Sequence, residues 1–162
     1  MNGAHAIAFA VDGGAVGIGI VAGLRTFTAP AVVGWGAHLG RLGLRGSRLG
    51  ILGGAWAAGV LTVLALAEYV GDLLPQTPNR TAPGPLTVRI LSGGVCGACV
   101  CVSGGGSAVA GAVAGAAGAV MGAFGGYQAR RRLVKRLGVK DAVIAIQEDL
   151  VAMGLAAVIV FL

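Results

Sequence analysis

The sequence has few charged and few aromatic residues. Only 11% of its 162 residues are charged and 5% are aromatic, whereas 56% are hydrophobic. An ordinary soluble domain carries about 25% charged residues, so this composition excludes a domain whose surface is kept in water. It also excludes a disordered chain, which needs low hydrophobicity and high charge. An integral membrane protein remains.

Motifs for catalysis and for metal binding are also missing. The two histidines, His5 and His38, are isolated, and the chain has no nucleophile elbow, HExxH or kinase motif. Cys96, Cys99 and Cys101 lie in an apolar segment without a nearby histidine, where cysteine acts as a small buried apolar residue. We therefore expect no enzyme activity, no metal and no cofactor. A membrane enzyme that acts on a lipid is a third hypothesis, placed last because the sequence shows no catalytic constellation.

Basic residues outnumber acidic ones, with twelve Lys and Arg against six Asp and Glu. They occur in short bursts between apolar runs, at Arg41, Arg45 and Arg48 and again over residues 130–140. A nucleic-acid-binding protein would spread its cations over a wettable face, so we expect no nucleic-acid partner. Basic bursts beside apolar segments favour loops that bind the anionic headgroups of a lipid bilayer.

Six apolar segments predict an all-α integral membrane fold, a single transmembrane helical bundle over residues 1–162. The segments cover about residues 4–24, 30–42, 51–74, 86–103, 107–127 and 141–162. The second segment is short, so it either tilts little, reaches only part-way or forms a re-entrant pair with the first. Thr28 is the expected N-cap of this second segment, because Pro30 suits a position near a helix start.

The two halves of the chain resemble each other in plan, on either side of a Pro-rich loop at residues 75–85. Each half, about 4–74 and 86–162, has two Gly-rich helices, a basic loop and a third helix that carries acids. Three spans per half is an odd number, so the second half enters the membrane upside down. Inverted repeats of this kind recur in transporters. The two basic loops then fall on opposite sides, and one of them breaks the positive-inside preference.

Acidic residues in the third and sixth segments are the main candidates for function. Glu68 and Asp72 are four residues apart and therefore share one helical face, and Glu148 and Asp149 occupy the matching place in the second half. An ionised carboxylate facing lipid costs about 2.5–3.5 kcal/mol, so these side chains should point into the bundle. Gathered there, they would bind a cation or carry protons. The alternative is that they pair with arginines and only fix the packing of the helices.

Arginines near these acids are the candidate partners. Arg25 stands alone between the first two segments. If that turn is re-entrant, Arg25 lies in the membrane and neutralises an acid or holds an anionic group. If both segments span, Arg25 is an interface anchor. Arg80 and Arg89 are further possible partners, and Asn79 and Arg80 are possible loop contacts.

Glycine recurs along the fifth segment with an average spacing of 3.5 residues. Small residues at such spacing let helix backbones approach closely in lipid. The expected helix-packing residues are Gly111, Gly115, Gly118, Gly122 and Gly125.

Three stretches carry a family resemblance: GLRTFTAP (23–30), EYVGDLLPQTPNRT (68–81) and DAVIAIQED (141–149). With them the chain resembles, over nearly its whole length, a family of small bacterial and plastid membrane proteins known as a domain of unknown function. The resemblance implies an integral membrane location, which we expect to be the bacterial plasma membrane. It implies no activity, substrate or ligand.

The leading hypothesis is a small polytopic transporter or channel for a small ion or solute, expected to form a homo-oligomer. Its transport would be linked to cations or protons through Glu68, Asp72, Glu148 and Asp149. The alternative hypothesis is a membrane scaffold that does not transport. Its Gly-rich helices would assemble it, and its basic loops would bind anionic lipid or a partner.

Overall fold

The computed structural model describes residues 3–44, 46–71, 81–138 and 141–162, and all regular structure in them is helical. The helices, in chain order, are α1 (Gly3–Leu24), α2 (Thr28–His38), the 3-10 helix η1 (Arg48–Gly53), α3 (Ala55–Gly71), α4 (Pro83–Ser103), α5 (Ala108–Leu137) and α6 (Asp141–Phe161).

Three of these helices are long and apolar enough to cross a membrane. Their candidate spans are Pro83–Ser103, Ala108–Arg136 and Val143–Phe161, and Gly13–Leu24 and Ala55–Gly71 form shorter apolar helices. The expected all-α membrane fold is confirmed.

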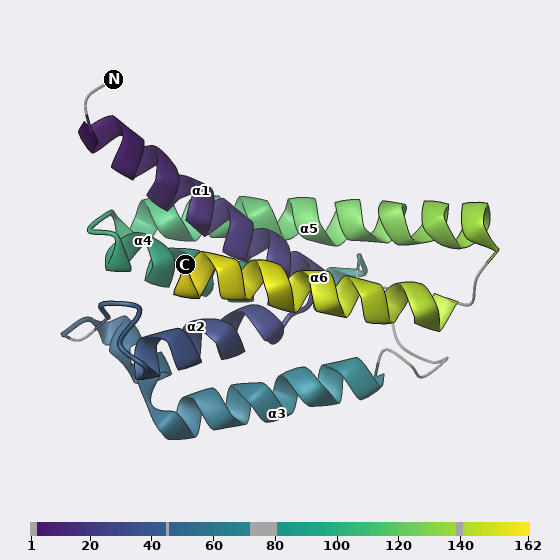
Figure 1. Ribbon diagram of the computed structural model, residues 1–162, viewed down its shortest axis with the longest axis horizontal. Coiled ribbons are helices and arrows are strands. Elements are labelled where there is room, and N and C mark those ends of the chain that lie inside the picture. The colour runs from purple at the N-terminus through teal and green to yellow at the C-terminus, as the bar shows by residue number, and fades with distance from the viewer. Residues whose placement is uncertain (1–2, 45, 72–80, 139–140) are drawn as a thin grey trace.

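The helices run roughly parallel or antiparallel along one long axis (Figure 1). α1, α4 and α5 pack most closely against one another, while α6 lies against α1 and α2. α3 packs mainly on α2 and η1, and of its residues only Ala58 and Ala65 are buried. The apolar core joins Ile18 and Val21 of α1 to α4 and α6. Cys96, Cys99 and Cys101 are buried free cysteines, and Cys96 and Cys99 belong to this core.

Glycines allow α1, α4 and α5 to approach each other. A Cβ added to Gly115 of α5 would lie 2.1 Å from the carbonyl oxygen of Gly93 in α4, and one added to Gly19 of α1 would lie 2.1 Å from the carbonyl oxygen of Gly115. No real Cβ fits at that distance. α5 therefore crosses α1 and α4 with backbones in direct contact.

The other glycines of α5 divide between the same two neighbours. Gly111 faces the backbone of Gly97 in α4, whereas Gly118 and Gly122 face the backbone of α1. Gly125 departs from the predicted set, because a Cβ added there has no atom within 4 Å. The close crossings in this structure are internal to one chain.

The predicted end of the fifth segment at residue 127 was wrong, and so was the basic loop that was to follow it. α5 continues through Arg130, Arg131, Arg132, Lys135 and Arg136 and ends at Leu137. The reason is local, since Gln, Ala, Arg, Leu and Lys are good helix formers and no glycine or proline intervenes. Gly138 then stops the helix with φ 63°, a left-handed conformation that suits glycine at a helix end.

Two predicted boundaries near α2 were also wrong. Phe27, not Thr28, occupies the N-cap position, and the Thr28 hydroxyl contacts another helix. α2 ends at His38 instead of residue 42, and α3 begins at Ala55 after the separate 3-10 turn η1. Glycines at 40, 43, 46, 50, 53 and 54 explain the interruption, because each weakens a helix.

Candidate functional site

The turn between α1 and α2, residues 25–27, lies inside the apolar length of the bundle. Gly23, just before it, packs against Ala119, Gly122 and Ala123 of α5. Arg130, the first charged residue of α5, lies about two helical turns, or about 10 Å, beyond that level. With 11 residues, α2 is only about 16 Å long, roughly half the hydrocarbon thickness. The two helices and this turn form the α1–α2 hairpin, and α2 is too short to cross the hydrocarbon layer.

Such a turn exposes backbone groups that must find partners within the protein, because hydrocarbon offers none. The carboxylate of Glu68, from α3, accepts hydrogen bonds from the backbone N–H groups of Thr26 (2.8 Å) and Phe27 (2.9 Å). Ser92 of α4 donates from its hydroxyl to the carbonyl oxygen of Thr26 at 2.6 Å. Glu68 thus caps the start of α2 with both of its oxygens.

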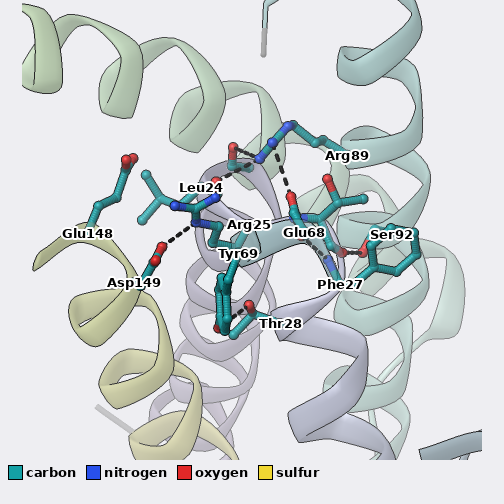
Figure 2. Close-up of polar contacts among 12 residues, drawn as sticks. Leu24, Arg25, Phe27, Thr28, Glu68, Tyr69, Arg89, Ser92, Glu148 and Asp149 are labelled. Atoms are coloured by element: carbon teal, nitrogen blue, oxygen red, sulfur yellow. Dashed lines mark hydrogen bonds and ion pairs between the residues drawn. The ribbon is translucent and has the colours of Figure 1, made fainter. Parts of the chain in front are cut away.

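Arg89 of α4 caps the other side of the break. Its Nη1 donates to the carbonyl oxygens of Gly23 (2.8 Å) and Leu24 (2.7 Å), the last turn of α1. Its Nη2 pairs with Glu68 Oε1 at 3.2 Å. Arg89 is 5% exposed, so one buried ion pair joins α3 to α4 and closes both ends of the hairpin turn (Figure 2).

Arg25 extends from the turn toward α6. It is fully buried, and its Nε forms an ion pair with Oδ1 of Asp149. On its other side the guanidinium carbon lies 5.4 Å from the ring centre of Tyr69, a cation–π distance. The Tyr69 hydroxyl hydrogen-bonds the Thr28 hydroxyl at 2.8 Å. Figure 2 shows Arg25 between Asp149 and Tyr69.

A third ion pair lies further along the bundle, toward the end of α5 that carries the basic residues. Glu148 Oε2 lies 3.9 Å from Nη1 of Arg130 in α5, and the two side chains are 9% and 16% exposed. We call the six residues in these three ion pairs the turn network: Arg25, Glu68, Arg89, Arg130, Glu148 and Asp149. Its formal charges cancel.

The structure therefore brings Arg25, Glu68 and Asp149 to one turn, whereas Glu148, the neighbour of Asp149, pairs with Arg130 further along α5. It differs from the expected carboxylate site in one respect, because each of these acids faces an arginine. That arrangement matches the alternative in which acids pair with arginines. Asp72, Asn79 and Arg80 lie outside the described residues. Among the described residues, no group of three or more His, Cys, Asp or Glu side chains gathers as a metal site requires.

Sequence reasoning placed Arg89 only among possible partners and overlooked Ser92, Tyr69 and Arg130 as members of the site. A signal existed for Arg89, which is the only charged residue of α4, and Ser92 follows it at the i+3 spacing that shares a helical face. Tyr69 and Arg130 had no such signal, because their roles depend on how α3 and α5 pack around the turn.

The ion pairs of the turn network are costly to break because Arg25 and Arg89 are buried. Breaking a buried pair by neutralising one partner costs about 3–5 kcal/mol, because the other charge is left alone. A proton or cation that neutralised Asp149 would leave the buried charge of Arg25 without its carboxylate. The Arg25–Asp149 pair therefore joins α6 to the α1–α2 turn through opposite charges.

Comparison with known proteins identifies a family and no closer relative. No curated protein and no solved structure matches the chain. One family model matches residues 13–162, nearly the whole sequence. The chain belongs to the family described as "Domain of unknown function (DUF4126)".

Proposed function

We propose that the protein is a small membrane transporter or channel in which the movement of protons or small cations is linked to the turn network. The observation that carries this proposal is Arg25, a fully buried arginine paired with Asp149 at a helix break. Ionisable residues inside a membrane are costly and are found chiefly where ions or protons pass. Broken helices near the middle of a bundle are likewise a feature of transporter binding sites.

The coupling step is a competition for the carboxylate of Asp149. A proton or cation that binds there weakens the pair with Arg25, and the released guanidinium favours a different position of the α1–α2 hairpin. Glu148 is close to Asp149 and pairs with Arg130. A proton or cation that enters from the basic end of α5 would therefore meet Glu148 before Asp149. Glu68 stays in place, because both of its oxygens hold the turn.

The directions of the helices agree with the inverted repeat that we propose as the origin of this arrangement. The chain reverses at each successive helix, so α1 and α4, α2 and α5, and α3 and α6 run in opposite directions (Figure 1). The acids of α3 and α6 approach the same turn from different sides (Figure 2). In transporters built from inverted repeats, the binding site lies at the interface of the two halves.

A flux measurement in liposomes tests the proposal. Purified protein is reconstituted in vesicles that contain a pH-sensitive dye, and a potassium gradient with valinomycin sets the membrane potential. We expect proton entry well above that of empty vesicles, or, in parallel vesicles that contain a cation-sensitive dye and no valinomycin, entry of sodium or potassium. Flux equal to that of empty vesicles for all three ions would overturn the proposal.

A membrane scaffold is the second candidate, favoured by the fact that Glu68 serves as a cap and each acid of the turn network faces an arginine. It would assemble as a homo-oligomer through the apolar surfaces of α3 and α6, where Val63 and Val151 are 65% and 62% exposed. Cross-linking in native membranes distinguishes the two. Stable oligomers together with absent flux favour the scaffold, whereas flux that survives when oligomers are absent favours the transporter.

A further inference from the structure

The last ten residues of α5, 128–137, extend the helix beyond its apolar part. Residues 108–127 contain no charged side chain, and 20 helical residues are about 30 Å long, the thickness of the hydrocarbon layer. The remaining ten residues begin where that layer ends and reach about 15 Å further. The headgroup layer on each side is about 5–7 Å thick, so the first turns of this extension cross it.

Four cations of the extension share one face. At 3.6 residues per turn, Arg131, Arg132, Lys135 and Arg136 fall within about 140° of the circumference. All four are exposed. Arg130 points elsewhere, toward Glu148 of α6. We call these four residues the basic face.

We propose that the basic face binds the phosphate headgroups of anionic phospholipids. Charge complementarity identifies the occupant as an anionic headgroup. Arg131 and Arg132 begin about 6–8 Å beyond the hydrocarbon layer, at headgroup depth. Lys135 and Arg136 begin about 12–14 Å beyond it, and their long side chains can extend back toward the headgroups. Arginine suits phosphate because its planar guanidinium donates two parallel hydrogen bonds. The lipid would fix the depth of α5, and with it the level of the hairpin turn.

The test compares lipids retained by the full-length protein. Wild-type protein and the fourfold variant R131Q, R132Q, K135Q, R136Q are purified from mixed vesicles of phosphatidylglycerol and phosphatidylcholine, and the bound lipids are counted by native mass spectrometry. The matched control is R41Q with R48Q, which removes two exposed arginines from the other basic segment. Circular dichroism verifies that all three proteins remain helical.

We expect the fourfold variant to retain at least about tenfold less phosphatidylglycerol than wild type. This follows from about 1 kcal/mol per cation near an anionic surface, where 1.4 kcal/mol is a factor of ten. The control removes two cations instead of four, so it should lose clearly less phosphatidylglycerol than the fourfold variant. The phosphatidylcholine count should change less than twofold in all three proteins. Equal retention of phosphatidylglycerol by wild type and fourfold variant would overturn the proposal.

Competition experiments with the same proteins distinguish binding of a lipid from binding of other anions. Short-chain phosphatidylglycerol should compete for the basic face, whereas inorganic phosphate at the same concentration should not. Binding of a labelled RNA that depends on the four cations, with unchanged lipid retention, would assign the surface to nucleic acid and contradict the proposal. None of these outcomes depends on whether the protein transports ions.

Discussion

Arg25 and Asp149 join the α1–α2 hairpin to α6 through an ion pair in which the arginine is fully buried. The two residues are more than a hundred positions apart in the chain. Their pair connects the helix break to the helix that carries Glu148, and so links the middle of the bundle to its basic end.

This ion pair should show strong coupling in a double-mutant cycle. Arg25→Met and Asp149→Leu each leave one buried charge without its partner, so each should lower the free energy of unfolding by about 3–5 kcal/mol. The double variant has neither charge, and its loss should be smaller than the sum by about 2 kcal/mol or more. Unfolding by sodium dodecyl sulfate in mixed micelles measures all four proteins. Additive losses would show that the two side chains do not interact.

Glu68 and Glu148 should differ in their effect on stability, although both are acids in the turn network. Glu68→Ala removes the hydrogen bonds to the backbone of Thr26 and Phe27, and it takes the carboxylate away from the buried Arg89. The free energy of unfolding should fall by about 3–5 kcal/mol. Glu148→Ala removes an ion pair of 3.9 Å, longer than the contacts of Glu68, so its cost should be smaller than that of Glu68→Ala. The same micelle titration compares them. A larger loss for Glu148→Ala would contradict the assignment of Glu68 as the cap.

Two glycines of α5 provide a matched pair of substitutions. Gly115→Ala places a Cβ 2.1 Å from the Gly93 carbonyl oxygen, so the helices must separate and the free energy of unfolding should fall by about 1–3 kcal/mol or more. Gly125→Ala meets no atom within 4 Å and should stabilise the helix by about 0.5–1 kcal/mol. Equal effects of the two changes would exclude the internal crossing described above.

The sequence predicts the all-α fold because apolar runs and glycine spacing are local patterns. It also predicts that α5 meets neighbouring helices closely, but not that Gly111 faces α4 while Gly118 faces α1, since that depends on tertiary packing. Arg25 and Glu68 were recognisable as isolated charges in apolar surroundings. The hydrogen bonds of Glu68 to the turn were not, because they require α3 to lie beside a break 41 residues away in the chain.

The length of α5 was predicted wrongly for a different reason, which is local and does not depend on tertiary packing. The run of charge over residues 130–136 predicts a loop only if charge marks the end of a helix. Charge marks the end of the apolar segment, whereas the helix ends only where the backbone requires it, at Gly138. Intrinsic helix propensity would have predicted the extension.

The position of the hairpin turn can be read from labelling of single cysteines. In a background with Cys96, Cys99 and Cys101 replaced by alanine, a membrane-impermeant maleimide should label Arg41→Cys and Arg132→Cys from opposite sides of a vesicle. Thr26→Cys should remain protected from both sides, because Thr26 is 7% exposed. Labelling of Thr26→Cys as fast as that of Arg132→Cys would place the turn in water and exclude a re-entrant hairpin.

The most direct test of ion transport through the turn network compares the flux of wild type, Asp149→Asn and Gln147→Ala in the same liposomes. Gln147 is exposed and close to Asp149 in α6, so its removal controls for general disturbance of the helix. We expect the flux of Asp149→Asn to be at least about tenfold lower than that of wild type, and the flux of Gln147→Ala to equal it. Equal flux from wild type and Asp149→Asn, with the protein folded in both, would contradict the account.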